Sequence, residues 1–167
     1  FKSNQLEINN IFKNYKIKEI GFSIYSKKLI KDLLKNKYIS SIQLPLNIIN
    51  KDFSGIKSKK NIVARSIFLQ GLLINSKLNK NNPILKKFNY KLLKLAHKKK
   101  INLYSLCLNY VLQNANVNKI VVGFDNISQL EKILKFKKKN INKKYIKLIN
   151  SLFSRKDYLK IKDPRKW

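Results

Sequence analysis

Two kinds of segment alternate along the chain. Short runs of β-branched and other apolar residues, such as KIVVG at 119–123, are typical of strands buried on both faces. Longer segments repeat an apolar residue every three or four positions, as amphipathic helices do. We therefore expect strands at 18–24, 41–46, 61–68 and 119–123, and helices at 27–36, 83–99, 103–113, 126–135 and 143–153.

Three of the expected helices carry start signals. Ser26 is placed to cap the helix at 27–36, because its oxygen can accept from a free N–H group of the first turn. Pro83 suits a first helical turn, where its missing N–H is not needed. Asn126 and Gln129 have the spacing of a capping box, in which two side chains satisfy free N–H groups.

Strands that alternate with helices predict a parallel α/β sheet. A doubly wound sheet and a β/α barrel both fit this order, and the pattern does not choose between them. The 167 residues are fewer than the roughly 200 that a complete eight-unit barrel needs. Because the chain also begins at Phe1 and contains no Met, we expect a fragment, with residues 1–167 forming one partial domain.

The sequence carries no sign of export or of a membrane span. The first ten residues are polar, unlike a secretory signal, and no apolar run approaches about 18 residues. Cys107 is the single cysteine and lies in an apolar stretch, where a buried thiol is expected. A lone cysteine forms no internal disulfide, so we expect a reducing, cytoplasmic location.

The formal net charge of +30 raises the possibility of a basic nucleic-acid-binding domain. Only Arg65, Arg155 and Arg165 among the 38 basic residues are arginine, the residue that base recognition favours. Lys, Asn and Ile are all abundant and share AT-rich codons, and lysines occur on four of the five expected helices. We therefore expect no specific nucleic-acid partner, only salt-sensitive binding of polyanions.

No set of catalytic groups can be assembled from the sequence. The eight acidic residues form no obvious pair, and His97 is expected to face solvent near a helix end. No phosphate-binding glycine loop and no metal-ligand spacing occur. In barrels, function lies at the carboxyl ends of the strands. Gln43 and Arg65 are the best examples of polar residues in otherwise apolar strands near these ends. Burying a polar side chain is costly unless it has a partner, so each is expected either to belong to a functional site or to make a satisfied contact in the core.

Four short motifs, in this order, resemble the aldo-keto reductases. They are IGFS at 20–23, IQLPLN at 42–47, ARSIFLQGLL at 64–73 and VVGFDNISQL at 121–130, and the closing DPRKW is similar to the tail of bacterial members. The resemblance covers roughly residues 18–134 and implies the fifth to eighth strands of a (β/α)8 TIM barrel. It also implies carbonyl reduction or alcohol oxidation by hydride transfer with NADP(H). The family's Asp, Tyr, Lys and His tetrad belongs to the first four strands, and none of it is present.

The resemblance also implies which residues would bind the cofactor. Ser23 and Gln43 match the residues that bind the nicotinamide carboxamide, and Arg65 takes the place of an aromatic residue that stacks on the ring. The pyrophosphate loop would include Ser66, Phe68 and Gln70, with Gly71 allowing a close turn. The adenosine phosphate would lie near Gly123, Phe124, Asp125, Asn126 and Gln129. Asp125 stands where many members have a basic residue, so NAD(H) is also possible.

Two alternatives to a reductase fragment remain open. One is a non-catalytic protein, either a degenerate relative or a half-barrel that pairs with a partner chain. The other is the basic nucleic-acid-binding domain. The reductase interpretation implies a small carbonyl substrate and no membrane partner, and the sequence gives no indication of the oligomeric state.

Overall fold

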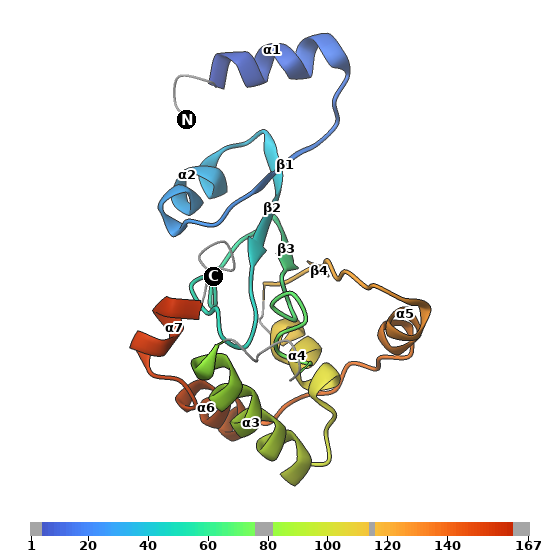
Figure 1. The fold of residues 1–167 in the computed structure, drawn as a ribbon. Helices are drawn as coiled ribbons and strands as arrows, with labels where there is room; N and C mark the ends of the chain where they lie inside the picture. Colours follow the sequence, from blue (N-terminus) through green and yellow to red (C-terminus); the bar gives the residue numbers. More distant parts are fainter. Residues whose placement is uncertain (1–4, 76–81, 114–115, 162–167) are drawn as a thin grey trace.

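A four-stranded parallel sheet forms the centre of the fold (Figure 1). The computed structural model describes residues 5–75, 82–113 and 116–161. The sheet runs in the order β1 (Ile20–Ser23), β2 (Ile39–Pro45), β3 (Asn61–Arg65) and β4 (Lys119–Ile120), with each neighbouring pair parallel. The carboxyl ends of all four strands therefore point to one edge, as the sequence predicts.

The core is built around β2, which has a strand on each side. Ile39, Ile42 and Leu44 of this strand are at most 2% exposed. Ile62 and Ala64 of β3 are buried beside them. The apolar runs therefore lie inside the fold, as expected for strands covered on both faces.

The helices follow the expected order. They are α1 (Gln5–Tyr15), a 3-10 turn at Lys27–Leu29 that leads into α2 (Ile30–Lys35), α3 (Pro83–Lys98), α4 (Leu103–Leu112), α5 (Ile127–Leu134), α6 (Lys143–Ser151) and α7 (Arg155–Ile161). Ser26 accepts a hydrogen bond from the N–H of Lys28 at 3.2 Å, and Pro83 begins α3 after an Asn82 cap. Both start signals are confirmed.

Helices α3, α4 and α6 pack through polar contacts as well as apolar ones. The Tyr145 hydroxyl of α6 donates to the carbonyl of Leu95 in α3 at 2.9 Å. The Tyr110 hydroxyl of α4 donates to Oδ1 of Asn150 in α6 at 2.7 Å. Figure 1 shows these helices and α7 gathered at the end of the molecule away from α1. These contacts fix α4, whose first turn reaches the candidate site.

Helices α1 and α7 were not predicted from the sequence. The first ten residues seemed only polar, yet α1 contacts the start of β2 through Phe12, whose ring centroid lies 5.5 Å from that of Tyr38. Helix α7 lies in the polar tail and begins after Ser154, whose oxygen accepts from the N–H of Asp157 at 3.1 Å. Helix α7 is short and mostly polar, so its apolar period gives little signal, whereas the apolar residues at 8, 11, 12 and 15 of α1 do have helical spacing.

Two expected strands end earlier than predicted. Strand β3 stops at Arg65 rather than residue 68, because Ser66 takes a positive φ of 58° that turns the chain out of the sheet. Strand β4 covers only Lys119–Ile120, and its last bond to β3 runs from the N–H of Val121 to the carbonyl of Ala64 at 2.8 Å. Once β3 has turned away, the VVG segment has no strand to pair with.

No helix in the described part of the chain is long and apolar enough to cross a membrane. Cys107 is fully buried, as expected, and burial raises the pKa of its thiol. A raised pKa keeps the thiol protonated and unreactive.

Lys60 ties the start of β2 to the loop before β3. Its Nζ donates to the carbonyl oxygens of Asn36 and Ile39. Lys60→Met is therefore expected to lower the free energy of unfolding by about 1.5 kcal/mol, the usual range for charge-assisted bonds. Urea denaturation measures the change. Lys59→Met removes the same charge from the exposed neighbouring position and is the control. Equal stability of the two variants would contradict the assignment.

Candidate functional site

Three of the predicted site residues form one hydrogen-bonded network across β1, β2 and β3. Ser23 and Gln43 are register partners, and the Ser23 hydroxyl donates to Oε1 of Gln43 at 3.1 Å. Nε of Arg65 donates to Oγ of Ser23 at 3.3 Å. The carboxyl ends of three strands therefore present an amide, a hydroxyl and a guanidinium together.

Arg65 is held in place by further contacts. Its guanidinium carbon lies 4.0 Å from the ring centroid of Tyr25, a cation–π geometry. Its terminal nitrogens donate to Oγ of Ser66 and to the carbonyl of Ile24, both at 3.4 Å. Arg65 therefore connects the strand-end network to the loop that follows β3.

The loop after β3 has an unusual backbone. Ser66, Leu69 and Gln70 have positive φ values of 58°, 50° and 54°, which residues other than glycine rarely adopt. Gly71 follows at 83°, a conformation that glycine adopts without strain. Among the described residues, no acceptor meets the N–H groups of Gln70 and Gly71. Two adjacent N–H groups of this kind are suited to bind an anion.

Two buried asparagines hold this loop at its ends. Nδ2 of Asn47 donates to the carbonyl of Ser66 at 2.9 Å, while its Oδ1 accepts from the N–H groups of Ile49 and Asn50. Nδ2 of Asn89, on α3, donates to the carbonyl of Leu72 at 2.8 Å. Both side chains are at most 2% exposed. They hold the loop in its strained conformation.

A cavity of about 470 Å³ lies between this loop and the segment after β4. Its size falls within the usual range for small-molecule sites, roughly 300–1,000 Å³. Predicted site residues line much of it, namely Ser66, Phe68, Gln70, Gly123, Phe124, Asp125 and Gln129. The sequence therefore identified both walls of the cavity.

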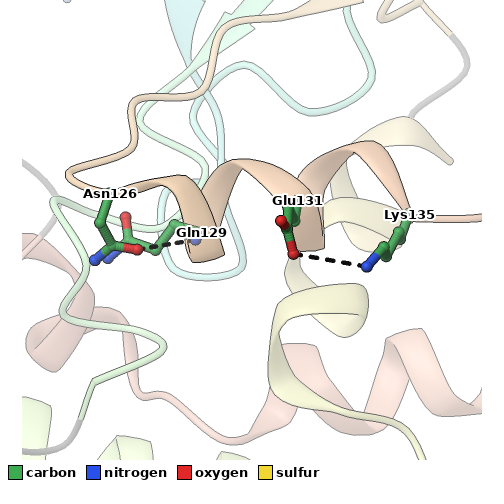
Figure 2. Close-up of polar contacts among 4 residues, drawn as sticks. All are labelled: Asn126, Gln129, Glu131 and Lys135. Atoms are coloured by element: carbon green, nitrogen blue, oxygen red, sulfur yellow. Dashed lines mark hydrogen bonds and ion pairs between the residues drawn. The ribbon is translucent and has the colours of Figure 1, made fainter.

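The helix start at α5, drawn in Figure 2, borders the cavity through Gln129. Oδ1 of Asn126 accepts from the N–H of Gln129 at 3.0 Å, as the capping box predicts. In return, Oε1 of Gln129 accepts from the N–H of Asp125 at 2.9 Å, one residue earlier than a capping box requires. Nε2 of Gln129 lies 3.5 Å from Oδ2 of Asp125. Gln129 therefore holds the backbone and the carboxylate of Asp125 in place.

Sequence analysis missed the contribution of α4. Tyr104 lines the cavity, and its ring centroid lies 4.2 Å from that of Phe68. Burial raises the pKa of its hydroxyl, and the nearby Asp125 and Cys107 raise it further. Asn75, Asn47 and Asn89 were also not predicted as site or support residues. The bonds from Asn47 and Asn89 to the loop after β3 join residues distant in sequence, so no local pattern marks that role.

The described residues contain no group of His, Cys, Asp and Glu that could hold a metal ion. His97 is exposed in the last turn of α3, as expected. What this edge of the sheet offers is hydrogen-bonding groups, backbone N–H groups and an aromatic pair. Such a site can bind and orient a polar ligand.

Comparison with known proteins agrees with this geometry. A parallel α/β sheet with a cavity at its carboxyl edge is typical of β/α-barrel proteins. Residues 8–153 match the aldo/keto reductase family, so the chain belongs to this family. Aldo-keto reductases are (β/α)8 barrels, and a parallel sheet of four strands is consistent with part of one. The family generally uses nicotinamide cofactors and acts on small carbonyl substrates.

Solved structures show the same fold at low sequence identity. The holo form of the aldo-keto reductase AKR11C1 from Bacillus halodurans is 19% identical, with a TM-score of 0.70 over 92% of this chain and 58% of that one. The glycerol dehydrogenase AKR11B4 from Gluconobacter oxydans is 18% identical, with a TM-score of 0.67 over 87% and 52%. The chain thus spans little more than half the length of these structures. Comparison with curated proteins gives no significant match.

Proposed function

We propose that residues 1–167 form the cofactor-binding part of an aldo-keto reductase barrel, corresponding to its fifth to eighth strands. The cofactor is a nicotinamide dinucleotide, NADP(H) or NAD(H), which supplies hydride for carbonyl reduction or accepts it in alcohol oxidation. The observation that carries the proposal is a continuous polar path. It runs from Gln43 through Ser23 and Arg65 to Ser66, and Ser66 in turn lines the cavity.

The chemistry of this path fits a dinucleotide. At one end, Ser23 and Gln43 offer the hydroxyl and amide groups that recognise a carboxamide. In the middle, the N–H groups of Gln70 and Gly71 suit a pyrophosphate. At the other end, Phe124, Asp125 and the start of α5 would border the adenosine. Arg65 would lie against the nicotinamide ring through its planar guanidinium.

The proton donor is proposed to lie on strands outside these residues. Among the described residues, no acid, histidine or lysine lies with Ser23 and Gln43 in the strand-end network. Among the described residues, strands β1 and β4 each pair on one side only, so either edge can accept a further strand. The same chain or a partner can supply those strands. The substrate is then a small carbonyl compound, and the protein is cytoplasmic with no specific nucleic-acid partner.

Calorimetric titration of the purified chain tests the proposal. NAD⁺ or NADP⁺ should bind at about 0.15 M salt, where the Debye length of about 8 Å screens most of the surface charge. Arg65→Met should weaken binding about tenfold, equal to about 1.4 kcal/mol. Lys94→Met removes the same charge from an exposed position on α3 and should leave the affinity unchanged. Failure of both dinucleotides to bind would contradict the proposal.

The missing proton donor has its own test. With NADPH or NADH and a panel of aldehydes, the chain alone should show no turnover above the uncatalysed rate. Turnover at a rate typical of enzymes, about 1 per second or more, would show that the proton donor lies within these residues.

A further inference from the structure

We infer that Asp125 makes this cavity select NAD(H) over NADP(H). The inference rests on the proposed function and concerns one group of the cofactor. NADP(H) differs from NAD(H) by a phosphate on the 2′-oxygen of the adenosine ribose, where NAD(H) has a hydroxyl. A hydroxyl can donate a hydrogen bond to a carboxylate, whereas a phosphate is repelled by it.

The composition of the cavity wall favours this selection. The chain has 38 basic residues and eight acidic ones, yet no Lys or Arg is among the described residues that line the cavity, and Asp125 is. A 2′-phosphate bound against this described part of the wall would therefore meet an acid, with no Lys or Arg among its described lining residues to offset it. Dinucleotide-binding sites that accept a 2′-phosphate rely on a positive side chain for this purpose.

Gln129 also holds the carboxylate of Asp125 in position beside the cavity. Gln129 accepts from the N–H of Asp125 at 2.9 Å, and its amide nitrogen lies 3.5 Å from Oδ2. The described residues place no cation in an ion pair with this carboxylate. Glu131 forms an ion pair with Lys135 further along α5, away from this carboxylate (Figure 2). The negative charge of Asp125 is therefore available to a ligand in the cavity.

The overall positive charge of the protein favours NADP(H), because its additional phosphate makes it more negative than NAD(H). This attraction comes from lysines outside the described cavity wall and falls off over a Debye length of about 8 Å at 0.15 M salt. A group bound in the cavity lies at contact distance from Asp125, where screening is weak. At 0.15 M salt and above, the local repulsion should therefore decide the preference.

Calorimetric titration of the 167-residue chain with NAD⁺ and NADP⁺ at 0.15 and 0.3 M salt tests the inference. NAD⁺ should bind at least about tenfold more tightly than NADP⁺. Asp125→Asn keeps the shape of the side chain and removes its charge, and should bring the two affinities to within about threefold by tightening NADP⁺. Glu131→Gln removes the same charge from the nearby helix α5, outside the cavity, and should leave the ratio unchanged.

The outcomes separate the inference from the proposed function. Tighter binding of NADP⁺ than of NAD⁺, or an unchanged ratio in Asp125→Asn, overturns the selection by Asp125 but leaves the dinucleotide site intact. An equal shift of the ratio in Glu131→Gln also overturns it, because the effect would then come from net charge. Failure of both dinucleotides to bind overturns the proposed function and this inference with it.

Discussion

Asn47→Ala is expected to lower the free energy of unfolding by about 3 kcal/mol, because it removes three hydrogen bonds that a buried side chain makes to backbone groups. These groups are the carbonyl of Ser66 and the N–H groups of Ile49 and Asn50, which the Asn47 side chain contacts at 2.7 to 2.9 Å. The asparagine is fully buried, so water cannot replace it. Urea denaturation followed by circular dichroism measures the loss.

The same substitution should weaken dinucleotide binding at least tenfold. Without the Asn47 amide, little holds Ser66 at its positive φ, and the loop that presents the N–H groups of Gln70 and Gly71 would relax.

Asn109→Ala is the control for both measurements. Asn109 is 3% exposed, and its Oδ1 accepts one bond, from the N–H of Lys139 at 2.7 Å, away from the cavity. Asn109→Ala should lower the free energy of unfolding by about 1.5 kcal/mol without changing the affinity for the dinucleotide. A loss of less than 1 kcal/mol in Asn47→Ala, or an unchanged affinity, would contradict the proposed role of Asn47.

Between pH 10 and 12 the protein is expected to lose about 2 kcal/mol of stability through Tyr110 alone. Burial raises the pKa of Tyr110 from 10.0 to about 12. Below pH 10 the hydroxyl is protonated in both states and contributes no pH dependence. Above pH 10 the unfolded chain releases the proton while the folded chain keeps it. The unfolded state is therefore favoured increasingly until the pH reaches the folded pKa.

Comparison of the native chain with Tyr110→Phe isolates this effect. The variant loses the 2.7 Å bond to Asn150 and so starts about 1 kcal/mol less stable at neutral pH. Its stability should then fall less steeply from pH 10 to 12, because titration of the lysines is common to both proteins. Urea denaturation at intervals across this range measures both curves. Tyr90→Phe controls for loss of a phenol at a position that is 68% exposed. Parallel curves for the native chain and Tyr110→Phe would contradict the effect.

The strands and most helix starts could be predicted because their signals are local. An apolar run such as IVV is expected to be buried, and Ser26 and Asn126 accept from N–H groups within three residues of themselves. Pro83 begins α3, where the N–H that it lacks is not needed. The order of elements then follows from parallel pairing. The resemblance of four short motifs also pointed to the correct family, since residues 8–153 match it.

The loop and its supports could not be predicted in the same way. Ser66, Leu69 and Gln70 adopt positive φ although none of them is a glycine, so their residue types give no signal. The bonds from Asn47 and Asn89 to the loop span 19 and 17 residues and depend on packing. Tyr104 reaches the cavity only because α4 is fixed against α6. Each of these features is tertiary in origin.

The position of Arg65 has a consequence for how the two halves of a bound dinucleotide influence each other. Its guanidinium contacts Ser23 on one side and Ser66 on the other, so one side chain is shared between the carboxamide region and the phosphate loop. Under the proposed function, a ligand fragment that moved Arg65 on one side would change the contact that Arg65 makes on the other side. The two ends of the proposed cofactor site would then be thermodynamically linked, so that binding at one end changes the affinity at the other.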